Sequence, residues 1–177
     1  MRPGYEGLFP ITARSNAEER IFKDDGDYLV GLSVMAAAPL TIHMLCLMPT
    51  HYHLLAWVDE GWLSRSIHAI NRKYAVAFNR RWKRHGHVFD SPTTTVPVVS
   101  EPHLLEVIRY IANNPRDPER WPYSSFPGTL GLRPQFSFVD DAFVTDLFAS
   151  TEDLRHFAAD RRSQEPGSAN LVPGSRP

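Results

Sequence analysis

Residues 40–58 constrain the fold more than any other part of this sequence. The run 40–48 is almost wholly apolar, Pro49-Thr50 interrupts it, and residues 51–58 resume with the composition of a strand. Short apolar and aromatic runs bounded by turn-forming residues are typical of strands. This segment therefore predicts two strands joined by a tight turn, or one strand that contains a bulge.

Hydrophobic periodicity and turn residues predict the other elements around this segment. Strands are expected over residues 5–13 and, with interruptions at Pro92 and Pro97, over 87–99. Helices are expected over 28–38, 63–84, 101–114, 140–148 and 151–162. Ser64 and Ser66 are candidate caps of the second helix. Residues 1–150 would form the main domain, 151–162 a C-terminal helix, and 163–177 a tail without fixed structure.

Cysteine content and hydrophobicity exclude several classes of protein. Cys46 is the only cysteine among 177 residues, so the chain forms neither an internal disulfide nor a cysteine-based zinc finger. Its apolar stretches are shorter than the roughly 20 residues of a membrane-spanning helix. The first residues lack the apolar core of a signal peptide. We therefore expect a protein of the reducing cytoplasm with no membrane partner.

The charged residues are unevenly distributed. A net charge of -1 argues against a nucleic-acid binder, yet residues 61–89 hold seven of the 19 basic residues and none of the 20 acidic ones. A basic helical face with aromatic neighbours fits phosphate neutralisation and base stacking. The alternative is an ordinary solvated helix face. It is disfavoured because like charges four residues apart on a helix repel one another. With an acidic remainder, DNA binding would be confined to one face and sensitive to salt.

Two short patterns could carry chemistry. His51 and His53 would project from the same face of a strand, as two members of a metal-ligand set that lacks a third. A His-x-His pair alone is a weak signal, because it often occurs without a function. Tyr110 lies off the apolar stripe of its helix, with Asn114 four residues further on. It is either a nucleophile or a partly exposed aromatic residue, whereas Tyr74 lies on an apolar stripe and is expected in the core.

In their order and spacing, several segments resemble the single-tyrosine HUH transposases, and most closely the REP-associated tyrosine transposases of bacteria. They are CLMPTHYHLL (46–55), YAVAFNRRWKRHGHVF (74–89), LLEVIRYIANNP (104–115) and WPYSSF (121–126). The similarity extends from about residue 5 to residue 145. It implies the α+β HUH nuclease fold, in which a central antiparallel sheet carries flanking helices in a ferredoxin-like or RRM-like arrangement.

The same resemblance implies a function and a set of site residues. His51, His53 and Asn114 would bind Mg²⁺ or Mn²⁺, and Tyr110 would attack single-stranded or hairpin DNA, leaving a 5′-phosphotyrosine link. The protein would act in the bacterial cytoplasm, associated with the nucleoid when bound to DNA, as a monomer or a homodimer. Charge and helix placement assign backbone contacts to Arg72, Lys73, Arg80, Arg81, Lys83 and Arg84.

Three departures from the family pattern leave other functions open. The helix before the His-x-His strand is short, with Gly26 and Gly31 where the family usually has a longer amphipathic helix. Residues 90–94 lack the family's basic stretch, and residues 116–119 replace its usual Val-Arg-Ala-Gly. One alternative is a domesticated HUH domain that binds hairpin nucleic acid without cutting it. Another is an unrelated metal hydrolase with water as its nucleophile, for which Tyr110 would be dispensable.

Overall fold

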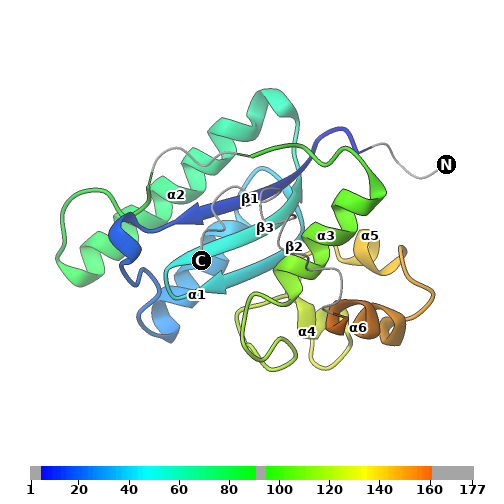
Figure 1. Cartoon of the computed structure of the whole chain (residues 1–177). Coiled ribbons are helices and arrows are strands. Elements are labelled where there is room, and N and C mark those ends of the chain that lie inside the picture. Colours follow the sequence, from blue (N-terminus) through cyan, green and yellow to red (C-terminus); the bar gives the residue numbers. More distant parts are fainter. Residues whose placement is uncertain (1–4, 91–94, 161–177) are drawn as a thin grey trace.

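The hairpin expected over residues 40–58 forms the centre of the protein in a computed structural model, which describes residues 5–90 and 95–160 (Figure 1). β2 (Thr41–Met48) and β3 (His51–Trp57) are antiparallel and joined by the two-residue turn Pro49-Thr50. β1 (Leu8–Arg14) pairs with the other side of β3, which gives a three-stranded antiparallel sheet in the order β1-β3-β2. The predicted α+β class with a central antiparallel sheet is confirmed.

Helices cover both faces of this sheet (Figure 1). In chain order they are η1 (Asn16–Glu18), α1 (Asp25–Ala36), α2 (Glu60–Trp82), α3 (Glu101–Ala112), α4 (Phe126–Thr129), α5 (Ala142–Thr145) and α6 (Thr151–Ala159). Side chains alternate along a strand, so one set faces α1 and α2 and the other faces α3. In β3, Tyr52 and Leu54 join the apolar cluster of α1 and α2, whereas Leu55 joins that of α3 and α6.

Irregular segments cover both edges of the sheet. On the β2 edge, the backbone N–H of Leu47 donates to Tyr123, and that of Ser125 donates to Leu45. On the β1 edge, the N–H of Asp90 donates to Arg14, and that of Val98 donates to Leu8. The strand predicted over residues 87–99 is therefore wrong for its described part. That segment makes single hydrogen bonds to the ends of β1, with one isolated bridge between Ser15 and Phe89. Residues 91–94 lie outside the described residues.

The helices begin and end close to the predicted residues, with one error in capping. The carboxylate of Asp59 accepts a hydrogen bond from the N–H of Gly61 and caps α2. The helix therefore starts before Ser64 and Ser66, and neither serine is its cap. α6 shares the apolar cluster of α3 through Leu154, so residues 151–159 pack into the same core as the preceding helices. The predicted tail at 163–177 lies outside the described residues.

The short helix α1 depends on close approach to its neighbours. A β-carbon added at Gly31 would lie 2.7 Å from Cε1 of Phe22, a buried ring that packs against the α1 side of the sheet. A side chain at this position would displace Phe22, so the glycine allows the two segments to touch. Among the described helices, none is both long and apolar enough to cross a membrane.

Candidate metal and nucleophile site

The antiparallel register places both histidines on the face of the sheet that α3 covers. His53 pairs with Thr12 and His51 with Arg14 across β1 and β3. Directly opposed residues in an antiparallel pair point to the same face. The two imidazole rings lie 4.8 Å apart between centroids and nearly perpendicular to one another. The His-x-His pattern therefore brings both side chains to one place, as predicted from strand geometry.

Asn114 lies between the two imidazoles. Its amide nitrogen donates to Nε2 of His53 at 3.1 Å, and its amide oxygen accepts from Nε2 of His51 at 3.2 Å. The residue follows the C-terminal end of α3, where the N–H of Asn114 donates to the carbonyl of Ile111. The turn after α3 thus delivers an amide to the two histidines, from about 60 residues further along the chain.

Threonine hydroxyls hold the other ring nitrogen of each histidine. Oγ1 of Thr12 lies 2.7 Å from Nδ1 of His53, and Oγ1 of Thr50 lies 2.9 Å from Nδ1 of His51. Because Nε2 of His53 accepts from Asn114, its Nδ1–H is the donor to Thr12. These contacts fix both rings with Nε2 directed at Asn114.

Burial keeps both imidazoles neutral. It lowers the pKa of His51 to about 4, with a further contribution from the charge of Arg14. Burial also lowers the pKa of His53 well below its usual value, helped by His51 and Arg14. Neutral imidazoles are the form that binds metal ions.

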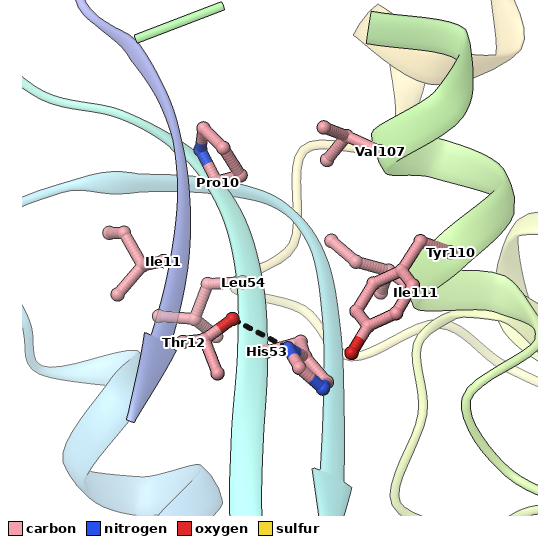
Figure 2. A pocket seen from close by; sticks show the side chains of 8 residues that line it. All are labelled: Pro10, Ile11, Thr12, His53, Leu54, Val107, Tyr110 and Ile111. Carbon is pink, nitrogen blue, oxygen red and sulfur yellow. Dashed lines mark hydrogen bonds between the residues drawn. The ribbon is translucent and has the colours of Figure 1, made fainter. Parts of the chain in front are cut away.

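Tyr110 lies against His53. The two rings meet edge to face with centroids 4.9 Å apart, and Figure 2 shows the Tyr110 hydroxyl directed toward the imidazole. Beside them is a crevice too narrow to hold a water molecule, which is lined in part by Pro10 and Val107. Burial raises the pKa of the Tyr110 phenol, while the charge of Arg14 acts to lower it. Tyr110 is therefore half-buried and close to the histidines, whereas Tyr74 is in the core, as predicted.

The donor set at this site fits a divalent ion. In an octahedral site with bonds of about 2.1 Å, neighbouring ligand atoms lie about 3 Å apart. The amide oxygen of Asn114 lies 3.2 Å from Nε2 of His51, which matches this spacing, while its amide nitrogen lies 3.1 Å from Nε2 of His53. With its oxygen turned to the ion, the amide would complete a set of two nitrogens and one oxygen. Among the described residues there is no group of three or more histidines, cysteines or carboxylates that could hold a metal. The ligand role of Asn114 was implied by the family resemblance, and the spacing of four residues from Tyr110 placed the two side chains on one face of the helix.

Sequence reasoning missed Thr12, Thr50 and Arg14. Thr50 adjoins His51, but Thr12 and Arg14 come from β1 and reach the site through its pairing with β3. Their spacing of two residues repeats that of the histidines, which is a detectable signal once the strands are known to pair.

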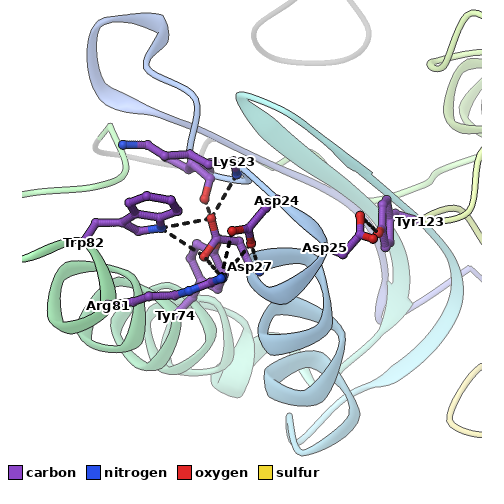
Figure 3. A network of polar contacts seen from close by, with 9 residues as sticks. Lys23, Asp24, Asp25, Asp27, Tyr74, Arg81, Trp82 and Tyr123 are labelled. Carbon is purple, nitrogen blue, oxygen red and sulfur yellow. Dashed lines mark hydrogen bonds and ion pairs between the residues drawn. The ribbon is translucent and has the colours of Figure 1, made fainter.

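The basic residues assigned to DNA lie on α2 or just beyond its C-terminal end, and α2 packs on the other face of the sheet through residues such as Ile70 and Tyr74. Arg81 contacts Asp24 at 2.7 Å and Asp27 at 2.8 Å, and Arg84 contacts Glu19 at 2.6 Å. Figure 3 shows Arg81 and Trp82 of α2 converging on Asp27 at the start of α1. These two of the six arginines and lysines thus have carboxylate partners that a count within residues 61–89 could not reveal.

The other four assigned residues are exposed along α2 and just beyond its C-terminal end: Arg72, Lys73, Arg80 and Lys83. No ion pair joins them to a carboxylate within residues 5–90 and 95–160. They form an uncompensated positive surface on α2, away from the histidines.

Comparison with known proteins establishes the fold. No family model and no curated protein matches the sequence. Among solved structures, the chain is similar to a REP-associated tyrosine transposase bound to a REP hairpin, with a TM-score of 0.55 and 18% identity over 76% of this chain and 92% of that one. A candidate transposase from Deinococcus radiodurans R1 aligns with a TM-score of 0.45 and 16% identity over 60% and 88% of the two chains, a likeness too weak to carry weight. The chain thus has the fold of the first of these proteins.

Proposed function

We propose that this protein is a transposase that nicks and transfers single strands of DNA at hairpin repeats, with Tyr110 as nucleophile and Mg²⁺ or Mn²⁺ as cofactor. Support for the substrate class comes from the resemblance in sequence and from the fold shared with a hairpin-bound tyrosine transposase. The exposed cations on α2 supply charge for the DNA backbone.

One observation carries the proposal. Two Nε2 atoms, one amide and one phenol converge from β3, from the turn after α3, and from α3 itself within a single chain. The His51–His53 pair and the Tyr110–Asn114 pair are separate patterns in the sequence, and in the structure Asn114 and Tyr110 contact the histidines. A site complete in one chain would let Tyr110 act in cis.

Each residue has a distinct task in the proposed reaction. His51, His53 and Asn114 would hold the divalent ion, which withdraws charge from the scissile phosphate when bound. The Tyr110 oxygen forms a bond to phosphorus while the bond from phosphorus to the 3′ oxygen breaks. The phenolic proton is lost to solvent and the departing 3′ oxygen takes one up. One phosphodiester replaces another, so reversal by a different 3′-hydroxyl rejoins strands without a nucleotide cofactor.

The decisive experiment tests for a covalent adduct. The protein is incubated with labelled single-stranded hairpin oligonucleotides and Mn²⁺, and the products are separated on a denaturing gel. We expect a protein–DNA adduct that Tyr110→Phe abolishes. Tyr123→Phe is the matched control, because that phenol donates to Asp25 and stacks on Tyr28, on the α1 side of the sheet.

The other outcomes identify other functions. Cleavage that survives in Tyr110→Phe would exclude a tyrosine nucleophile and favour the metal hydrolase. Binding of hairpins without any adduct would favour a domesticated binding domain.

A further inference from the structure

Arg14 lies at the junction of the metal ligands and the nucleophile. It is the last residue of β1 and pairs with His51 across the sheet, so it shares the face of the site with Thr12. The side chain is partly buried. Its charge adds to the effect of burial in lowering the pKa of His51 and of His53, and it opposes the burial-driven rise in the pKa of Tyr110, as expected of a guanidinium at this position in the β1–β3 register.

Within residues 5–90 and 95–160, no carboxylate neutralises this arginine. No carboxylate in the described part of the chain forms an ion pair with Arg14, and its Nε is buried without a hydrogen-bond acceptor. Arg81, although more exposed, has two carboxylate partners. Buried charges are ordinarily paired, because removing them from water is costly. A partly buried cation without a counter-charge, among neutral imidazoles, creates a place for an anion from outside.

We propose that Arg14 binds a non-bridging oxygen of the DNA phosphodiester that Tyr110 attacks, an inference that rests on the proposed function. A guanidinium offers paired N–H donors in the geometry of a phosphate, and such contacts are stronger in a site shielded from water. Arg14 is thus a phosphate-binding residue of the site. The phosphate would lie next to Arg14, Tyr110 and the histidines, within reach of the phenol that attacks it.

The first test measures binding without chemistry. Affinity for a single-stranded hairpin oligonucleotide is measured in EDTA at several salt concentrations, for the wild type and for Arg14→Gln. Loss of one phosphate contact should reduce the slope of log affinity against log salt by about 0.7. The matched control is Arg65→Gln, an exposed arginine of α2 that stacks on Trp62. A slope identical to that of the wild type in Arg14→Gln would overturn the inference.

The second test separates phosphate binding from activation of the phenol. In single-turnover adduct formation with Mn²⁺, Arg14→Gln should react about 100-fold more slowly than the wild type at every pH from 7 to 10. A defect that disappears at high pH would show that Arg14 only assists ionisation of Tyr110, and would overturn the inference. If Arg14→Gln fails to fold, Arg14→Lys decides: it should react about 10-fold more slowly because it loses the paired donors, and a wild-type rate would count against the inference.

The two proposals fail in different ways. A wild-type protein that binds the hairpin and forms no adduct would exclude the nickase, while the salt dependence would still decide the role of Arg14. If Arg14→Gln forms the covalent adduct as fast as the wild type, the role of Arg14 is excluded and the proposed nickase activity stands.

Discussion

The hydroxyl of Thr12 lies 2.7 Å from Nδ1 of His53, across the paired strands β1 and β3. This contact leaves Nε2 of His53 directed at Asn114, so β1 orients a proposed metal ligand that belongs to β3. Hydrogen bonds of this kind fix the tautomer of a ligand and are worth about 10–100-fold in metal affinity.

Thr12→Val should therefore weaken Mn²⁺ binding by about 10–100-fold, because the isosteric side chain cannot accept the Nδ1 proton. Titration calorimetry measures the affinity, and circular dichroism verifies the fold. Thr41→Val, at the exposed start of β2, is the control that should leave the affinity unchanged. Equal affinities in Thr12→Val and the wild type would mean that the threonine does not support a metal ligand.

Acid should destabilise the metal-free protein through its buried histidines. The pKa of His51 is about 4 in the folded protein and about 6.5 in an unfolded chain. Between these values only the unfolded state takes up the proton, so this contribution to stability is present above pH 6.5 and is lost as the pH falls toward 4. We expect His51→Gln to take up about one proton fewer on unfolding than the wild type, as measured by urea unfolding in EDTA across this pH range. The control is His68→Gln, an exposed residue of α2. An unchanged pH dependence in His51→Gln would contradict this assignment.

Asp27 should be the most important carboxylate for stability. It is only 2% exposed and accepts from Nη1 of Arg81, from Nε1 of Trp82 and from the backbone N–H of Lys23. Asp27→Asn should lower the free energy of unfolding by about 2 kcal/mol, because an amide weakens charge-assisted hydrogen bonds. Asp24→Asn, which affects an exposed partner of the same Arg81, should cost clearly less. Equal losses in urea unfolding would show that burial does not set the strength of these contacts.

The cations of α2 should differ in their effect on DNA binding. Arg80→Gln and Lys83→Gln should each reduce the slope of log affinity against log salt, for binding to single-stranded DNA, by about 0.7. Neither side chain has a carboxylate partner among the described residues. Arg81→Gln should leave the salt dependence unchanged and lower stability. A comparable loss of salt dependence in Arg81→Gln would show that DNA displaces Asp24 and Asp27.

The sequence predicted the local part of this structure well. The Pro49-Thr50 break and the apolar stripe of α3 are properties of neighbouring residues, so the hairpin and the off-stripe position of Tyr110 follow from short patterns. The meeting of Tyr110 with His53 depends on how α3 packs on the sheet, and it was expected only because the segments resemble a known family.

Non-local pairing caused the errors and the omissions. The alternation of β1 does not say which strand it joins, so the roles of Thr12 and Arg14 were invisible until the β1–β3 register was known. The charge of residues 61–89 looked uncompensated because Asp24 and Asp27 lie far away in sequence. Residues 95–99 have strand-like composition, but they cover the β1 edge of the sheet without joining it as a strand. The N–H of Val98 donates a single hydrogen bond to Leu8 of β1.

The covered edges of the sheet also bear on assembly. Segments of the same chain bind the carbonyls of Leu8 and Arg14 at the ends of β1 and the N–H of Leu47 on β2, and Pro10 within β1 has no N–H to offer. Two copies therefore could not pair their edge strands into one continuous six-stranded sheet unless these segments were first displaced. A pairing of copies that keeps these segments in place would use helical or loop surfaces of the described chain.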